Sequence, residues 1–223
     1  MEPDPLAIVL LSLRVAAVAT FGAALVGVPT AWWLARRDFP GKVVVEALVA
    51  LPLVLPPVVT GYALLLLFGR RGLIGEALGL PLSFTWVGAA IAAGVVGFPL
   101  MVRALRQGIE AVDPGLEAAV RTLGASPMRT FLEVTLPLAA PGLVTGSLLC
   151  FARALGEFGA TITFAGNVPG ETRTLTLAIW SALQTTAGED QAAVLVGVSV
   201  ALAVGAVALG ELVGRRLQAR VEP

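Results

Sequence analysis

Five long apolar stretches are the feature of this 223-residue sequence that most restricts how it can fold. An α-helix needs about 20 predominantly apolar residues to cross the hydrocarbon core of a bilayer, and four of the stretches reach that length. The third is shorter and needs Trp86 and Arg103 at its ends as interfacial anchors. The sequence therefore predicts an all-α polytopic membrane protein, one domain over residues 1–223, with five transmembrane helices in residues 6–34, 43–68, 87–102, 136–164 and 192–213.

The composition excludes several other classes of protein. Hydrophobic residues make up 57% of the chain and charged residues 13%, which is too apolar for a soluble domain. The net charge of zero gives no reason to expect nucleic acid as a partner. Histidine is absent and Cys150 is the single cysteine, so neither an intramolecular disulfide nor a Cys/His metal cluster is expected. The only Gly-Lys pair, Gly41–Lys42, lacks the rest of a P-loop, so ATP binding by that route is excluded.

Basic residues predict which ends of the helices face the cytoplasm. Five spans place the two termini on opposite sides, and a cytoplasmic C-terminus puts ten basic residues inside and three outside. The ten are Arg36, Arg37, Lys42, Arg103, Arg106, Arg121, Arg129, Arg215, Arg216 and Arg220, and the three are Arg70, Arg71 and Arg173. Because cytoplasmic segments are enriched in Lys and Arg, the N-terminus is expected outside. Residues 165–190 then form an extracytoplasmic loop, in which residues 175–187 are expected to form a short interfacial or re-entrant helix.

A polar segment, residues 113–131, separates the third and fourth spans. Asp113–Pro114 and Ser126–Pro127 each have the pattern of an N-cap followed by proline at the first helical position, and Gly124 fits a left-handed C-cap. The segment therefore predicts two short cytoplasmic helices bent at Gly124. The first has an apolar face made by Leu116, Ala119, Val120 and Leu123. Helices this short need a surface to dock on, which is either a protein or the lipid headgroups.

The spacing around this bend resembles the coupling loop of bacterial ABC importer permeases. That loop has an acidic-Ala-Ala triplet, three residues, Gly, nine residues, an aliphatic residue, one residue and Leu-Pro. Gly124, Val134 and Leu136–Pro137 keep this spacing, whereas the literal triplet, Glu117 to Ala119, lies one residue early. The resemblance implies that the segment docks on a cytoplasmic ATPase through Glu117, Ala118, Ala119, Leu123, Gly124 and Pro127.

Other segments resemble the permease subunit of molybdate ABC importers, so that the resemblance covers essentially the whole chain. They are FPGK (39–42), LPLVLPPVVTGYALL (51–65), GRRGLIGE (69–76) and ARALGEFGATITFAGNVPGETRT (152–174). The resemblance implies a type I importer permease of the cytoplasmic (inner) membrane with a cytoplasmic double coupling helix. The implied partners are a second copy of the chain, two cytoplasmic ATPase subunits that use ATP and Mg, and an extracytoplasmic oxyanion-binding protein. The chain itself is then a transport subunit rather than an enzyme, and it binds no cofactor or metal.

Two charged residues in the fourth stretch are candidates for the substrate pathway. Arg153 and Glu157 are four residues apart, so they are expected to share one face of a helix and to face protein or water rather than lipid. Either Arg153 offers positive potential to a passing oxyanion, or the two charges neutralise each other and lock helices together. The second reading is preferred, because a pathway that held its anion tightly would not release it.

Prolines in the second stretch point to a further part of the pathway. Pro52, Pro56 and Pro57 remove backbone hydrogen bonds, so they are expected to face a cavity or a neighbouring helix. A static kink is preferred over a gate hinge. Pro57 is therefore a candidate for the pathway, and Thr60 and Tyr62, which follow it on the same helix, are the remaining candidates.

The resemblance thus implies an ATP-driven permease that translocates an oxyanion, best matched by molybdate, by alternating access. Sulfate, thiosulfate or tungstate are alternative substrates. A passive anion channel and a scaffold or sensor without transport are alternatives from other classes, and a channel has no need of a capped cytoplasmic double helix.

Overall fold

All elements in the described part of the chain are helical. The computed structural model describes residues 4–79, 82–185 and 188–221. Its elements are α1 (Pro5–Arg36), α2 (Lys42–Val54), α3 (Pro57–Phe68), α4 (Leu73–Leu78), α5 (Trp86–Glu110), α6 (Pro114–Thr122), α7 (Pro127–Thr130), the π-helix η1 (Phe131–Thr135), α8 (Leu136–Leu138), α9 (Ala140–Leu155), α10 (Gly159–Phe164), α11 (Leu175–Leu183) and α12 (Glu189–Val221).

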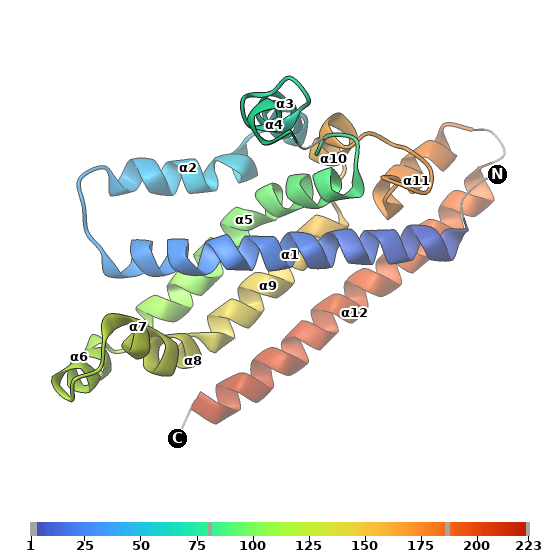
Figure 1. The fold of residues 1–223 in the computed structure, drawn as a ribbon. Helices are drawn as coiled ribbons and strands as arrows, with labels where there is room; N and C mark the ends of the chain where they lie inside the picture. Colours follow the sequence, from blue (N-terminus) through green and yellow to red (C-terminus); the bar gives the residue numbers. More distant parts are fainter. Residues whose placement is uncertain (1–3, 80–81, 186–187, 222–223) are drawn as a thin grey trace.

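Three long helices, α1, α5 and α9, form the centre of the molecule (Figure 1). The helix α1 lies along α5, α9 packs against both, and α12 lies against α9 and α11. Small side chains allow the close approach of the central helices, because the buried cluster between them is rich in alanine. Its alanines are Ala16, Ala19, Ala89, Ala90, Ala93, Ala154 and Ala165.

Four helical stretches of the described chain are long and apolar enough to cross a membrane, and a bent pair gives up to five. The pair joins residues 127–138 to residues 140–155 at an angle of 69°. This agrees with the all-α membrane fold predicted from the sequence. The third predicted span is longer than its apolar core, because α5 continues to Glu110.

The second apolar stretch is divided, in contrast to the prediction of one span with a static kink. The helix α2 ends at Val54, and Leu55 has an extended backbone with φ −67° and ψ 144°. Pro56 and Pro57 follow directly, and a proline disfavours the α conformation in the residue before it. Pro52 lies inside α2, so a single proline is tolerated where two consecutive ones end the helix.

The fourth apolar stretch is divided as well. The helix α9 ends at Leu155 and α10 begins at Gly159, so Glu157 lies in the break between them. The prediction that Arg153 and Glu157 share one helical face is therefore wrong, although the two side chains do meet. The segment after α10 returns over the bundle as α11, which buries Leu175 and Leu177.

Candidate functional site

The helices α6 and α7 form a projection at the end of the molecule that lies opposite the first residues of α1 (Figure 1). The carboxylate of Asp113 accepts a hydrogen bond from the Gly115 amide at 2.8 Å, and the Ser126 hydroxyl accepts one from the Arg129 amide at 3.3 Å. Gly124 lies between the two helices with φ +90°, a conformation that side chains with a Cβ rarely adopt. Both caps and the bend were predicted from the sequence.

The outer surface of this projection is apolar and exposed. Leu123 is 87% exposed, Met128 66% and Leu116 49%. Ala118, Ala119 and Pro127 are exposed beside them. A cluster of large exposed apolar side chains outside the membrane-spanning helices is typical of a surface that binds another protein.

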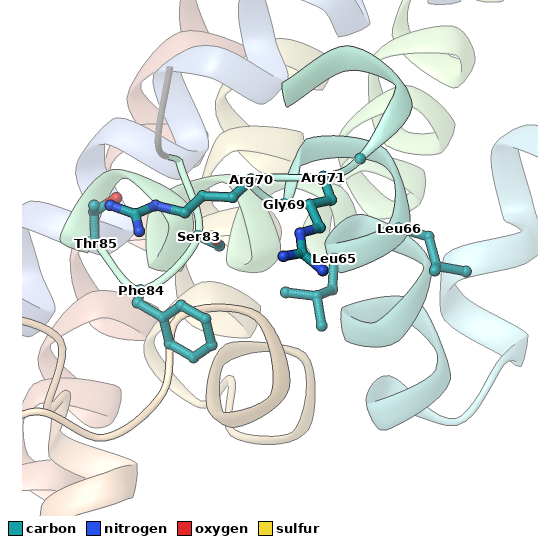
Figure 2. A pocket seen from close by; sticks show the side chains of 9 residues that line it. Leu65, Leu66, Gly69, Arg70, Arg71, Ser83, Phe84 and Thr85 are labelled. Carbon is teal, nitrogen blue, oxygen red and sulfur yellow. The ribbon is translucent and has the colours of Figure 1, made fainter. Parts of the chain in front are cut away.

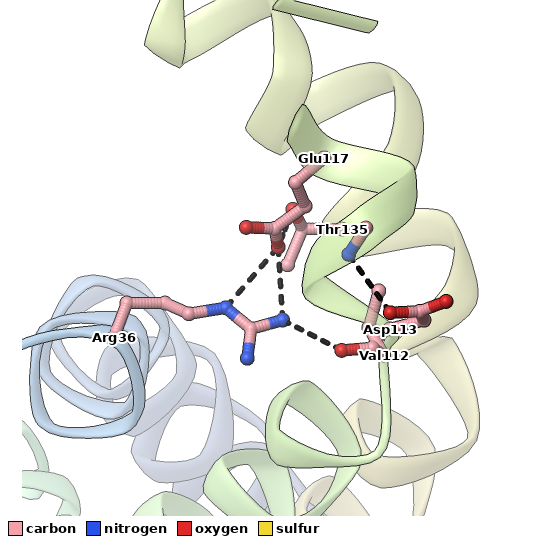
Figure 3. Close-up of polar contacts among 6 residues, drawn as sticks. Arg36, Val112, Asp113, Glu117 and Thr135 are labelled. Carbon is pink, nitrogen blue, oxygen red and sulfur yellow. Dashed lines mark hydrogen bonds and ion pairs between the residues drawn. The ribbon is translucent and has the colours of Figure 1, made fainter. Parts of the chain in front are cut away.

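Glu117 lies on the inner side of α6, unlike the other residues expected to contact the ATPase (Figure 3). Its Oε1 accepts hydrogen bonds from Arg36 Nη2 at 2.9 Å, from Arg36 Nε at 3.2 Å and from Thr135 Oγ1 at 2.7 Å. Arg36 Nη2 also donates to the Val112 carbonyl at 3.1 Å. Arg36 and Thr135 were not identified from the sequence, where the only signal was an acidic residue beside the apolar face of α6.

The Arg153–Glu157 pair lies at the break between α9 and α10. Arg153 Nη1 is 2.7 Å from Glu157 Oε2, and the two side chains are 29% and 1% exposed. Glu157 Oε1 accepts the Ala160 amide at 2.8 Å, and the Glu157 carbonyl accepts the Thr176 hydroxyl at 2.7 Å. Glu157 therefore connects α9, α10 and α11. Its Oε2 has the ionic contact but no hydrogen bond of good geometry within the described residues.

The helix α3 crosses α10 next to this break. A Cβ on Gly61 would lie 2.7 Å from the Ala160 carbonyl oxygen, so only glycine permits this approach. Thr60 is buried at the crossing, and its Oγ1 has no hydrogen-bond partner among the described residues. The start of α3, at Pro57, also lies against α10 at Gly159.

The structure thus brings four of the five pathway candidates into one region, namely Pro57, Thr60, Arg153 and Glu157. The fifth, Tyr62, is 55% exposed on the surface of the chain. Thr60 Oγ1 and Glu157 Oε2, the buried side-chain oxygens for which the described residues provide no hydrogen bond, also belong to this region.

A cavity of about 660 Å³ lies at the other end of α3, where the chain turns toward α4 (Figure 2). Arg70 and Arg71 extend over it, and neither forms an ion pair with a carboxylate of the described chain. Its opposite wall contains Ser83 and Phe84, and Phe84 is 56% exposed. Phe84 has φ +59°, an uncommon value for an aromatic residue and one that is associated with functional sites.

Comparison with known proteins identifies the class. Residues 27–223 match the family model of the binding-protein-dependent transport system inner membrane component. The chain belongs to this family, and it is a membrane permease subunit of an ABC transporter. The crystal structure of an amino acid ABC transporter with histidines covers 95% of this chain and 93% of its own, with a TM-score of 0.61 and 18% identity. That likeness supports the type I permease fold.

More similar sequences narrow the class further. The molybdenum transport system permease protein ModB of Escherichia coli K12 is 51% identical over 93% of this chain and 92% of the relative. The protein of the same description from Haemophilus influenzae is 46% identical over 95% of this chain and 94% of the relative. A probable molybdenum ABC transporter permease of Haloferax volcanii is 43% identical over 91% of this chain and 73% of the relative. The resemblance inferred from the sequence motifs is confirmed.

Proposed function

We propose that this permease imports molybdate across the cytoplasmic membrane by alternating access, driven by ATP hydrolysis in a separate subunit. The substrate is supported by full-length relatives that are described as molybdenum transport permeases at 51% and 46% identity. The coupling to ATP is supported by the exposed apolar surface of α6 and α7. This surface is the observation that carries the proposal, because a passive channel has no use for a rigid, capped projection outside the membrane.

The proposed assembly contains two copies of this chain, two cytoplasmic ATPase subunits and an extracytoplasmic oxyanion-binding protein. In this arrangement ATP and Mg belong to the ATPase subunits, and this chain contributes no catalytic group. The N-terminus lies outside, and α6, α7 and the C-terminus lie in the cytoplasm. Cysteine labelling tests this orientation in a Cys150→Ser background. An impermeant maleimide added to spheroplasts should label a cysteine at the exposed Glu171 and not one at Leu123; the reverse result would overturn the orientation.

The cavity at Arg70 and Arg71 then lies on the extracytoplasmic side and faces the binding protein. Leu66 and Phe84, 55% and 56% exposed, line the cavity together with the two arginines, and Leu73, 82% exposed, follows them in the chain. Arginine and aromatic residues together are typical of the centre of a protein interface. The partner surface that complements them carries carboxylates around an apolar patch.

Two mirrored substitutions test the function and both surfaces. Leu123→Asp places a charge on the α6–α7 surface and should release the ATPase subunit during purification, because a buried apolar anchor is lost. Leu73→Asp should leave the ATPase bound but reduce the stimulation of ATP hydrolysis by the binding protein, each variant serving as the control for the other.

Uptake of labelled molybdate into proteoliposomes, with tungstate, sulfate and thiosulfate as competitors, decides the substrate. ATP-independent uptake by the wild type would favour the channel instead.

In the transport cycle we assign the Arg153–Glu157 pair a structural role. The Glu157 side chain accepts the amide of Ala160 in α10, and its carbonyl accepts the hydroxyl of Thr176 in α11, so Glu157 joins elements of the fold. Thr60 lies at the same crossing of α3 and α10, and we assign it to the wall of the substrate pathway when these two helices move apart. Pro57 starts α3 at the break, where a change of angle between α2 and α3 would alter that crossing.

A further inference from the structure

Glu117 and Arg36 together join four separate segments of the chain at the α6 end of the helix bundle. Glu117 Oε1 in α6 is bonded to Arg36, the last residue of α1, and to Thr135, the last residue of η1. Arg36 also holds the carbonyl of Val112, in the link between α5 and α6. The bonds measure 2.7–3.2 Å, and the Arg36 and Glu117 side chains are only 16% and 10% exposed.

This cluster rests on the packed end of the transmembrane helices. Val112 is 4% exposed and belongs to a buried apolar cluster with Leu34 of α1 and Ile109 of α5. Trp32 and Phe131 form a second contact between α1 and η1. Their ring centroids are 5.7 Å apart in an edge-to-face arrangement. The attachment of α6 and η1 to α1 is therefore a packed joint, and not a single surface ion pair.

The joint and the docking surface are on different sides of one nine-residue helix. At about 100° per residue, Glu117 lies about 160° around α6 from Ala119. Leu116 and Leu123 are on the exposed side, whereas Glu117 is buried. Glu117 and its bonds therefore connect the side of α6 that faces away from the docking surface to α1 and η1.

Thr135 extends the connection to the helix that enters the membrane. It is the last residue of the π-helix η1, and residues 127–138 meet α9 at an angle of 69°. π-Helical turns are rare and are frequently found at functional sites. The same Glu117 oxygen is thus connected to α1 on one side and, through η1 and α8, to α9 on the other.

We propose that Arg36, Glu117 and Thr135 are positioning residues that transmit the movement of α6 to α1 and α9. The proposal rests on the proposed function, in which α6 and α7 receive the movement of an ATPase. Glu117 then acts through Arg36 and Thr135 and does not contact the ATPase. The guanidinium plane of Arg36 suits this role, since it binds Glu117 and the Val112 carbonyl at once.

The test compares Glu117→Gln and Thr135→Val with a matched control on the same segment. The control is Arg129→Gln/Glu133→Gln, which removes an ion pair whose side chains are 65% and 55% exposed. Each variant is assembled with its ATPase and binding protein in proteoliposomes, and molybdate uptake per ATP hydrolysed is measured. We expect a fall of about tenfold for Glu117→Gln, within the usual range for coupling between two sites. Thr135→Val, which keeps its shape and loses one bond, should fall less, and the control should equal wild type.

A second measurement does not depend on transport. A spin label at Arg121, in a Cys150→Ser background, reports the mobility of α6 in the purified permease in nanodiscs. Glu117→Gln and Arg36→Lys should increase that mobility, while the Arg129/Glu133 control should not. Failure of wild-type uptake would count against the proposed function alone, because the mobility would still test the joint.

Three results would overturn this proposal. The first is unchanged molybdate uptake per ATP in folded Glu117→Gln, and the second is unchanged spin-label mobility at Arg121 in the same variant. The third is an equal loss of uptake and of ATP hydrolysis that only follows the amount of intact complex. If Glu117→Gln fails to fold, Thr135→Val and Arg36→Lys decide the outcome by the same two measurements.

Discussion

Glu117 and Glu157 are the acidic residues that the described part of the chain buries, and each is paired with an arginine. At Glu117 one carboxylate oxygen accepts three hydrogen bonds, and the arginine also binds a carbonyl. At Glu157 the oxygen nearest the arginine has no hydrogen bond of good geometry with any described residue, and the side chain is only 1% exposed. The two pairs therefore have similar distances, 2.9 and 2.7 Å, but different degrees of hydrogen-bond satisfaction.

The difference separates two uses of buried charge. A carboxylate oxygen that accepts several hydrogen bonds at the edge of the helix bundle fixes the relative positions of the segments that it joins. A carboxylate that is more deeply buried and less completely bonded depends on its one counterion, because removing either partner leaves an uncompensated charge. We therefore expect Arg153–Glu157, called the inner pair because it is more deeply buried, to govern whether the chain folds. We expect Arg36–Glu117, the outer pair, to govern how movement is transmitted.

The largest expected effect comes from breaking the inner pair. Arg153→Gln or Glu157→Gln alone should destabilise the fold by about 3–5 kcal/mol, as is typical when one partner of a buried pair is removed. The double variant should recover part of the folded protein, since no unpaired charge is left. The yield of monodisperse detergent-extracted protein measures this, together with uptake by whatever folds.

The inner pair also has a clear alternative outcome. If Arg153 serves the passing anion, Arg153→Gln should fold normally and lose transport, and Glu157→Gln should have a mild effect because it leaves a positive site. Well-folded single variants with selective loss through Arg153 would make it a pathway residue and contradict the structural role.

An intermediate effect is expected at the bend of the outer region. Gly124→Val forces a β-branched residue into φ +90°, which costs about 1 kcal/mol or more even though a Cβ there would meet no atom within 4 Å. The variant should stay in the membrane, while ATP hydrolysis should become uncoupled from uptake. Gly197→Val is the matched control, since Gly197 in α12 also has open space but lacks a positive φ. Normal coupling in Gly124→Val would show that coupling does not depend on the backbone conformation at Gly124.

The smallest effect is expected at an exposed pair near the same end. Lys42 Nζ is 2.9 Å from Asp38, and this hydrogen bond lowers the pKa of the Asp38 carboxyl below its ordinary value. Any stabilisation is therefore present above the ordinary aspartate pKa and is lost as the pH falls through the lowered value. Because Asp38 is fully exposed, Asp38→Asn should leave the melting temperature at pH 7 unchanged. A drop of several degrees would show that exposed pairs also hold the α1–α2 turn.

Local signals in the sequence were sufficient for the outer region. N-caps, prolines and a glycine are read from a few neighbouring residues, so α6, α7 and the bend at Gly124 were predicted correctly. The all-α membrane fold was also predicted, because hydrophobic length is a property of continuous segments; of the five expected spans, the described chain has four long apolar helices and one bent pair. The direction in which Glu117 points was not, since its partner Arg36 is 81 positions away in the chain.

The inner region required information that apolar length does not contain. The stretch 136–164 predicts one span because it is mostly apolar, with Arg153 and Glu157 as its charged residues, yet the helix stops at Leu155 and resumes at Gly159. That break is stabilised by contacts from other elements, such as the Thr176 hydroxyl on the Glu157 carbonyl. In the second stretch the prolines were recognised, but two consecutive prolines disfavour the α conformation at both Leu55 and Pro56, so the helix ends there instead of bending.

The π-helix η1 makes the length of the chain, as well as its charges, important for this permease. A π-helical turn contains one more residue than the α-helical turn that it replaces, because its hydrogen bonds run from i to i+5. Deleting one residue from Phe131–Thr135 would permit a regular α-helix there. It would also rotate everything before the deletion by about 100° relative to α9. The apolar tip at Leu123 and Met128 would then face a different direction while every side chain in it stayed the same. The direction in which this tip faces therefore depends on the number of residues in η1, and not only on their chemistry.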